Sequence, residues 1–228
     1  MKYKFLLFDA DHTLFDFNKS EYLALKSALE QLGCPSTDAH IERYSEINVK
    51  YWKMLERGEI DKISLKLARF VEFGREFGFE DKAETLSDLY MENLAHESHL
   101  FDGALELVEG LSKNYRLFII TNGVKSTQDG RFGVSPITKY FEKIFISEVI
   151  GAEKPSVEFF SAVEKEIEGF DKSRAIVIGD SLSSDIKGAI NFGIDCIWFN
   201  PRKKEAPDGW DITYNVSSFD EILKILEN

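Results

Sequence analysis

Residues 5–16 read FLLFDADHTLFD and combine an apolar run with a pair of acids. The four apolar residues at the start are too few for a helix and predict a strand that is buried on both faces. This strand stops at Asp9 and Asp11. In an open sheet of parallel strands, ligands bind beyond the carboxyl ends of the strands. The segment therefore predicts a strand that delivers two carboxylates to a binding site.

Asp9 and Asp11 are separated by one residue, so both side chains can turn toward the same side of an extended segment. Such a pair suits a hard cation such as Mg²⁺, with one carboxylate free to attack and the other to move a proton. An isolated Asp-x-Asp is more often a solvated turn. The assignment therefore depends on Thr13, at the next alternate position, and on the groups that later strands carry.

The composition is that of an ordinary globular protein, with 228 residues, 43% hydrophobic and 30% charged. This length allows one domain, or one domain with an insertion. The formal net charge of -12 argues against a nucleic-acid polymer or an anionic membrane as partner, because both would be repelled. An anionic substrate would have to be captured by local positive charge.

The two cysteines, Cys34 and Cys196, are far apart and lack metal-type spacing. A reducing compartment is therefore expected, and with it a cytoplasmic location. No segment approaches the roughly 18 apolar residues of a membrane span.

Residues 17–100 are predicted to form a helical cap domain, while residues 1–16 and 101–228 form the core domain. Apolar residues recur at helical spacing through the inserted part, which a simple alternation of strands and helices would not show. The predicted helices of the cap lie at about 21–32, 38–57, 64–73 and 81–95.

The chain after residue 101 alternates short apolar runs with amphipathic segments, which predicts an α/β fold with a parallel sheet and right-handed crossovers. The predicted strands are 116–120, 144–146, 175–178, 196–199 and 213–216. The predicted helices include 104–114, a polar stretch around 126–131, a short one at 136–141, 157–168, one ending at 192, and 219–226.

Polar groups follow the ends of several of these strands, or the loops beside them: Thr121, Asn122, Lys154, Asp180 and Asp185. Phosphoryl transfer needs an in-line nucleophile, a cation, donors for the phosphate oxygens and a proton donor for the leaving group. We expect Asp9 to attack phosphorus and form an aspartyl-phosphate. Asp11 would protonate the leaving alcohol and then deprotonate the attacking water.

Three residues are candidates for binding the phosphate. The Thr121 hydroxyl and the backbone N–H of Asn122 would hold phosphate oxygens, and Lys154 would supply a positive charge that offsets the phosphate and the crowded acids.

The expected Mg²⁺ site consists of the carboxylates of Asp9 and Asp180 and the main-chain carbonyl of Asp11. Asp185 would lie behind these ligands and orient them.

Four ordered segments carry a family resemblance: DADHT at 9–13, TNG at 121–123, KP at 154–155, and GDS at 179–181 followed by Asp185. Together they resemble the motifs of the haloacid-dehalogenase-like (HAD) phosphohydrolases. The resemblance implies a Rossmann-like core, an inserted helical cap and Mg²⁺-dependent phosphatase chemistry through a phosphoaspartate. The roles assigned above agree with the family scheme at each matching position.

A narrower resemblance is to the YjjG/YfnB-type 5′-nucleotidases, carried by residues 8–17, 146–148, 154–155 and 196–200 and by the cap residues Trp52, Gly58, Ile60, Arg69 and Phe70. It implies that the substrate is a nucleoside monophosphate, with pyrimidine and deoxy compounds favoured. One departure is residues 124–134, where Gly130 and Gly133 disfavour helix, so we expect this part to be less helical than in the relatives.

The role of the cap residues is left open by the sequence. Arg69, Phe17 and Trp52 are candidates to line a pocket over a base, where stacking and bidentate hydrogen bonds would help. Their alternative roles are cap core for the aromatic residues and a surface ion pair for the arginine.

Other functions on the same fold are a sugar-phosphate or phosphoglycolate-type phosphatase, a phosphomutase, a 2-haloacid dehalogenase and a non-catalytic binding protein. A dehalogenase needs no proton donor two residues after its nucleophile, so Asp11 argues against it. A pure binding protein has no use for both Asp9 and Asp11.

Overall fold

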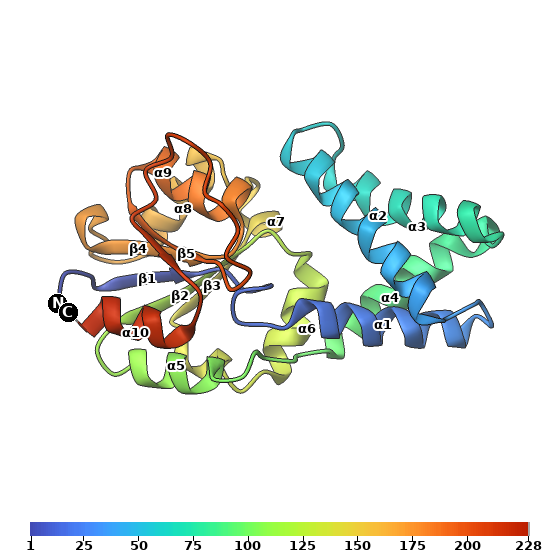
Figure 1. Cartoon of the computed structure of the whole chain (residues 1–228), viewed down its shortest axis with the longest axis horizontal. Helices are drawn as coiled ribbons and strands as arrows, with labels where there is room; N and C mark the ends of the chain where they lie inside the picture. The colour runs from blue at the N-terminus through green and yellow to red at the C-terminus, as the bar shows by residue number, and fades with distance from the viewer. Residues whose placement is uncertain (228) are drawn as a thin grey trace.

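The computed structural model describes residues 1–227 and contains a six-stranded parallel sheet (Figure 1). The strand order is β3-β2-β1-β4-β5-β6, with crossovers on both sides of β1. The strands are β1 (Phe5–Phe8), β2 (Arg116–Thr121), β3 (Lys143–Ile146), β4 (Ala175–Gly179), β5 (Asp195–Phe199) and β6 (Tyr214–Val216). The predicted buried strand at residues 5–8 is confirmed, because β1 lies at the centre of the sheet and all four of its residues are buried.

Helices cover both faces of the sheet. Side chains alternate along β1, so its successive residues pack against the helices on opposite faces. Leu6 and Phe8 pack into the cluster that contains α5 and α10, whereas Phe5 and Leu7 pack into the cluster that contains α8 and α9. The core helices are α5 (Ala104–Leu111), α6 (Lys125–Val134), α7 (Ser147–Ile150), α8 (Val157–Glu166), α9 (Lys187–Phe192) and α10 (Phe219–Glu227). This arrangement confirms the predicted α/β class.

Four helices between β1 and α5 form a separate layer at one end of the molecule (Figure 1): α1 (Phe17–Gln31), α2 (Asp38–Glu56), α3 (Lys62–Phe77) and α4 (Ala83–His96). They bury their own hydrophobic cluster, which is built around four aromatic rings. Tyr44 lies 4.9 Å from Phe70, 5.4 Å from Phe73 and 5.5 Å from Tyr90 between ring centroids. The predicted helical insertion is therefore present, while the exact domain boundaries stay a prediction.

The chain enters and leaves the cap along two segments that lie side by side. The N–H of Asp16 donates to the carbonyl of His99 at 2.9 Å, and the N–H of Phe101 donates to the carbonyl of Leu14 at 3.0 Å. The Asp16 carboxylate also accepts from the N–H of Lys19 and so caps α1, as expected for an acid at a helix start.

The helical stretch predicted around 126–131 is confirmed as α6, which runs from Lys125 to Val134, and neither glycine interrupts it. Gly130 explains this: a Cβ there would lie 2.6 Å from the carbonyl oxygen of Ala95 in α4. The glycine lets α6 lie directly against α4, and this packing offsets its propensity cost of about 1 kcal/mol.

Smaller differences concern short elements. The helix that starts at Ala104 ends at Leu111 rather than at 114, and only Thr138–Tyr140 of the predicted helix at 136–141 is helical, as a 3-10 turn.

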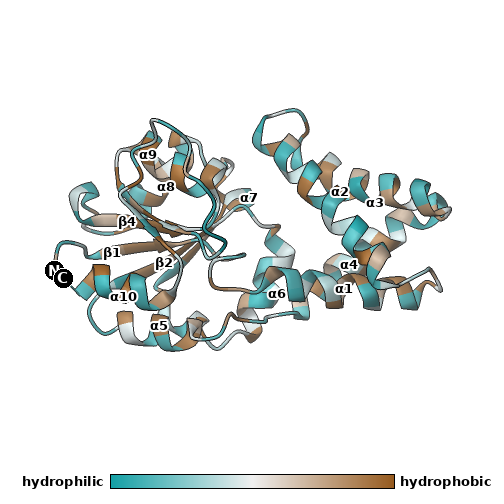
Figure 2. Cartoon of the chain, viewed as in Figure 1, coloured by the Kyte–Doolittle hydropathy of each residue, from teal (hydrophilic) through white to brown (hydrophobic). Residues whose placement is uncertain are grey.

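Cys34 and Cys196 are buried free thiols. In Figure 2 hydrophobic residues concentrate on the strands, and within residues 1–227 no helix combines the length and apolarity that crossing a membrane requires.

Candidate active site

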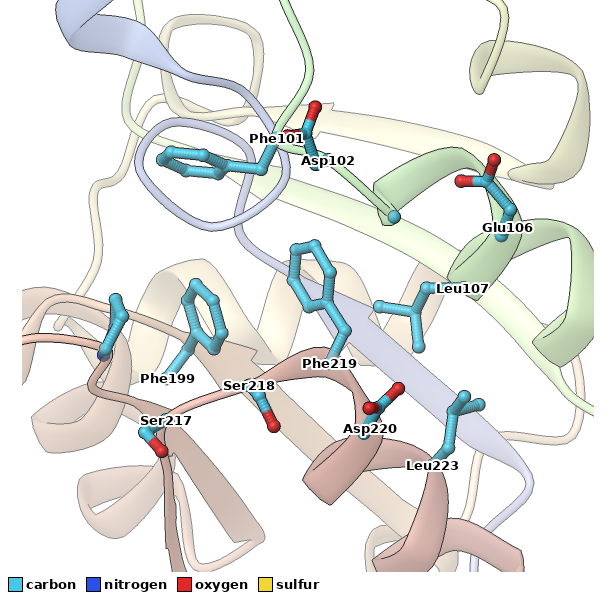
Figure 3. A pocket seen from close by; sticks show the side chains of 12 residues that line it. Phe101, Asp102, Glu106, Leu107, Phe199, Ser217, Ser218, Phe219, Asp220 and Leu223 are labelled. Carbon is cyan, nitrogen blue, oxygen red and sulfur yellow. The ribbon is translucent and has the colours of Figure 1, made fainter.

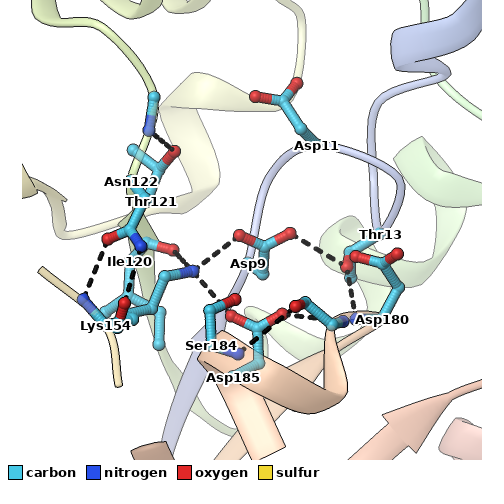
Figure 4. Close-up of polar contacts among 12 residues, drawn as sticks. Asp9, Asp11, Thr13, Ile120, Thr121, Asn122, Lys154, Asp180, Ser184 and Asp185 are labelled. Atoms are coloured by element: carbon cyan, nitrogen blue, oxygen red, sulfur yellow. Dashed lines mark hydrogen bonds and ion pairs between the residues drawn. The ribbon is translucent and has the colours of Figure 1, made fainter. Parts of the chain in front are cut away.

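Lys154 lies at the centre of the polar groups beyond the sheet (Figure 4). Its Nζ donates to Asp9 Oδ1 at 2.7 Å, to Asp185 Oδ1 at 2.6 Å and to the carbonyl of Ile120 at 2.8 Å. All three N–H groups of the ammonium are therefore used, and the lysine is 2% exposed. A cation buried this deeply is tolerated because two carboxylates pair with it.

Thr13 joins the first acidic loop to the end of β4. Its hydroxyl donates to Asp9 Oδ2 at 3.1 Å, and its oxygen accepts from the backbone N–H of Asp180 at 3.1 Å. Asp9 and Asp180 are thereby brought to the same side of the sheet, as their positions at strand ends suggest.

The acids of this cluster repel one another. Burial and the charge of Asp185 raise the pKa of Asp9 to about 7, against the opposing effect of Lys154. Burial and the charge of Asp9 also raise the pKa of Asp180 well above its ordinary value. Burial lowers the pKa of Lys154, but the charges of Asp185 and Asp9 outweigh it, so the net shift is upward. The site favours added positive charge.

Carboxylate oxygens of Asp9, Asp180 and Asp185 lie within 4.8 Å of one another and could hold a metal ion. A set of hard oxygen donors with excess negative charge fits Mg²⁺. Asp185 is one of these three acids, and its expected role of orienting the ligands from behind stays a prediction. Gly179 makes room for it, since a Cβ there would lie 2.4 Å from Asp185 Oδ2. Coordination by the main-chain carbonyl of Asp11 stays a prediction.

Thr121 is the last residue of β2 and Asn122 follows it, beside Lys154. The Thr121 oxygen accepts from the N–H of Gly123 at 3.0 Å and from Gln128 Nε2 at 3.2 Å, which leaves its O–H to donate. The Asn122 amide brackets the backbone of Lys154: Nδ2 donates to the lysine carbonyl at 2.8 Å, and Oδ1 accepts from the lysine N–H at 2.9 Å. The asparagine side chain thus fixes the lysine loop.

Asp11 points away from the Lys154 cluster (Figure 4). Its Oδ1 forms an ion pair with Arg131 Nη1, and its Oδ2 accepts from Gln128 Nε2 at 2.7 Å. Sequence reasoning missed both partners. The sequence feature that could have revealed them is that Gln128 and Arg131 are three residues apart in a segment beside the phosphate loop. In a helix this spacing places both side chains on one face.

Two ion pairs that the sequence did not reveal connect the cap to the core. Lys62, at the start of α3, pairs with Glu153 at 2.8 Å and donates to the carbonyl of Asn122 at 2.9 Å. Lys66 pairs with Glu148 at 2.9 Å. The cap therefore contacts the loop that carries the candidate phosphate-binding residues and brings positive charge to it.

Arg69 is buried in the cap, so the alternative of a surface ion pair is wrong. Its Nη1 donates to Asn48 Oδ1 at 2.6 Å, and its guanidinium carbon lies 5.3 Å from the centre of the Tyr90 ring. Nη2 lies 3.4 Å from Met91 Sδ, a sulphur that the Thr127 hydroxyl of α6 also approaches at 3.9 Å. Arg69 is thus linked to the cap side of α6, not to the acids at the strand ends.

A separate hollow lies where α5, α10 and the segment after β5 meet (Figure 3). Phe199, Phe219, Asp102 and Glu106 are among the side chains that line it. None of the predicted site residues does.

Residues 6–199 match the family model described as haloacid dehalogenase-like hydrolase. The chain belongs to this family. The match spans the parallel sheet from β1 to β5, the helical insertion and every site residue described above.

Three relatives are similar over nearly their whole length. Pyrimidine 5′-nucleotidase PynA of Streptococcus pneumoniae is 38% identical, covering 100% of this chain and 96% of that protein. Pyrimidine 5′-nucleotidase YjjG of Escherichia coli is 29% identical, covering 99% of each. A crystal structure of the HAD-hydrolase YfnB of Bacillus subtilis, described as bound to magnesium and revealing interdomain movement, is 35% identical with a TM-score of 0.95 and covers 100% of both chains.

Proposed function

We propose that this protein is a Mg²⁺-dependent phosphomonoesterase that hydrolyses nucleoside 5′-monophosphates, with pyrimidine nucleotides as its main substrates. The observation that carries the proposal is the buried Lys154, which pairs with Asp9 and Asp185 beside a third acid, Asp180. A nucleophilic carboxylate, a fixed positive charge and a set of oxygen ligands are what phosphoryl transfer requires.

In the first step of the proposed reaction, a carboxylate oxygen of Asp9 bonds to phosphorus, and the bond from phosphorus to the ester oxygen breaks. Asp11 gives its proton to the departing oxygen. In the second step a water molecule gives a proton to Asp11, its oxygen bonds to phosphorus, and the bond to Asp9 breaks. The products are an alcohol and inorganic phosphate, and both acids return to their starting state.

The surrounding groups hold the phosphate in place. The Thr121 hydroxyl and the backbone N–H of Asn122 donate to phosphate oxygens, and Lys154 supplies positive charge. Mg²⁺ held by Asp9, Asp180 and the main-chain carbonyl of Asp11, with Asp185 beside them, would neutralise charge on the phosphate.

The proposed substrate rests on the named activity of the relatives and on charge. Two of them are pyrimidine 5′-nucleotidases similar to this chain over at least 96% of their length. A chain with net charge -12 needs local cations to bind a nucleotide, and Lys62 and Lys154 supply them beside the phosphate loop. The proposed substrate is thus a small anion. The proposed location of the protein is the cytoplasm, which is a reducing compartment.

The test is phosphate release from a panel of nucleoside monophosphates and sugar phosphates in the presence of Mg²⁺. We expect dUMP and dTMP to be hydrolysed with higher kcat/KM than any sugar phosphate. The opposite order would overturn the nucleotide assignment while leaving the phosphatase assignment in place.

Asp9→Asn tests the nucleophile. We expect kcat to fall by at least about 10⁴-fold, since an amide cannot form the phosphoenzyme, with an unchanged circular dichroism spectrum. Asp208→Asn, at an exposed position, is the matched control and should keep full activity. A near-normal rate in Asp9→Asn would refute the role given to this carboxylate.

A further inference from the structure

Arg131 is a buried cation whose ion pair is with Asp11. The arginine has no exposed surface, and its Nη1 pairs with Asp11 Oδ1. Its Nε donates to the carbonyl of Glu97, where the chain leaves the cap, at 3.0 Å. The guanidinium carbon lies 4.6 Å from the centre of the Phe15 ring, a cation–π distance. The Glu97 carbonyl and the Phe15 ring therefore fix the guanidinium on two sides, in addition to its ion pair with the acid.

Gln128, one turn earlier on α6, holds the other oxygen of the same carboxylate. Its Nε2 lies 2.7 Å from Asp11 Oδ2 and 3.2 Å from Thr121 Oγ1, and its Oε1 accepts from Arg131 Nη1 at 3.4 Å. Each oxygen of Asp11 thus accepts one N–H. A carboxylate offers about four lone-pair positions, so two are left for proton transfer.

Asp11 needs such partners because burial alone does not hold its side chain in one orientation. Its side chain is 23% exposed, whereas that of Asp9 is 10% exposed. A proton donor must lie within hydrogen-bond reach of the atom it serves, and a displacement of about 1 Å can cost about 10²-fold in rate. The bonds to Arg131 and Gln128 restrict the directions in which this carboxyl can point.

We propose that Arg131 and Gln128 are positioning residues that hold Asp11 in line for both proton transfers, an inference that rests on the phosphomonoesterase activity proposed above. Neither residue exchanges a proton. The proton moves from the Asp11 carboxyl to the leaving oxygen as the ester bond breaks, and it is replaced from the water that attacks the phosphoenzyme.

The experiment compares wild type, Arg131→Met and Asp11→Asn on aryl phosphates of graded leaving-group acidity, from p-nitrophenyl to phenyl phosphate, and on dUMP. A good leaving group departs without a proton, so the acid matters little there. We expect Arg131→Met to lose about 10²-fold in kcat on dUMP and phenyl phosphate and less than about 10-fold on p-nitrophenyl phosphate. Asp11→Asn should give the same pattern.

Three further variants separate positioning from stability. Arg131→Met added to Asp11→Asn should cost no further kcat, because the arginine acts through the acid. Arg131→Lys should restore part of the lost rate. Phe132→Leu is the structural control: it is buried on the same helix with its ring 5.2 Å from that of Phe15, and it should leave the leaving-group dependence unchanged.

The outcomes are distinct. Equal losses on all esters, or a full further loss in the double variant, would overturn the positioning role while the phosphatase activity of wild type stands. If Arg131→Met does not fold, Gln128→Met takes its place in the same comparison. A wild type that releases phosphate from none of these esters would refute the proposed function and this inference together.

Discussion

The end of the sheet and the interior of the cap both bury charged groups, but they satisfy them differently. At the sheet, Lys154 uses all three N–H groups and pairs directly with Asp9 and Asp185. In the cap, Glu21 and Arg69 are joined only through the amide of Asn48, which lies 2.6 Å from each.

The two regions also differ in what they leave unpaired. Within residues 1–227, Arg69 Nε and the hydroxyls of Tyr44 and Tyr90 are buried without hydrogen-bond partners. At the sheet, every N–H of the Lys154 ammonium has a partner. The cap core instead holds several buried donors without one, which is rare in folded proteins.

The largest effect is expected at Lys154. Lys154→Met removes the cation from two buried carboxylates and should cost about 3–5 kcal/mol in the free energy of unfolding measured in chelator, with a loss of at least about 10³-fold in kcat. Lys143→Met removes an exposed lysine that pairs with Glu166 and should cost at most about 1 kcal/mol. Equal stability of the two variants would show that the charges at the sheet are not interdependent.

Removal of one candidate metal ligand should have the next effect. Thermal unfolding of wild type should shift upward with Mg²⁺, because the ion binds the folded state. Asp180→Asn should need about 10–100-fold more Mg²⁺ for the same shift, as estimated from the effect of altering metal-site groups. Asp129→Asn, on the exposed face of α6, is the control. Identical Mg²⁺ dependence in both variants would exclude Asp180 from the metal site.

Arg69→Met tests whether the cap recognises the substrate. If the guanidinium binds the base, kcat/KM should fall about 10-fold for dUMP and stay within about 2-fold for p-nitrophenyl phosphate, which lacks a base. Arg75→Met alters an exposed arginine on the same helix and should change neither. A parallel loss on both substrates would assign Arg69 to the stability of the cap instead.

The smallest effect is a pH dependence of stability at Glu21. Burial raises its pKa above the ordinary value of 4.5, despite hydrogen bonds from Ser45 and Asn48. The folded state then binds the proton more tightly than the unfolded chain, so this contribution is fully present below about pH 4.5 and is lost as pH rises through the folded pKa. The stability of wild type relative to Glu21→Gln should therefore decline as pH rises from 4.5 toward neutrality.

Glu72 provides a control of opposite sign in the same cap. The hydrogen bond from Lys50 lowers its pKa. The stability of wild type relative to Glu72→Gln should therefore increase with pH until the carboxyl is ionised in both states. The two slopes can be read from urea unfolding midpoints, and slopes of the same sign would contradict the opposite pKa shifts of the buried Glu21 and the half-buried Glu72.

The sequence predicted the sheet and the grouping of its polar residues because both depend on local patterns. Short apolar runs indicate buried strands, and parallel strands direct the residues that follow them to one edge. Asp9 and Asp180 could be grouped in this way without knowledge of any contact, whereas Lys154 comes from a loop and was placed by the order of the family motifs.

The partners of Asp11 could not be predicted, because they depend on how a helix packs. Gly130 reads as a helix breaker in isolation, and only its contact with Ala95 shows that it lets α6 approach α4. That approach sets the position of Gln128 and Arg131. The burial of Arg69 was likewise not visible in the sequence, since its partners Asn48 and Met91 come from two other helices of the cap.

The saturated ammonium of Lys154 has a consequence for the order of events. A phosphate that arrives at this lysine cannot simply add a hydrogen bond, because every N–H is already donated to Asp9, Asp185 or the carbonyl of Ile120. If phosphate binds here as proposed, one of these acceptors has to give up its hydrogen bond from the lysine to the incoming anion. Mg²⁺ held by Asp9 would share that carboxylate with the lysine, and the lysine N–H could then turn to the phosphate.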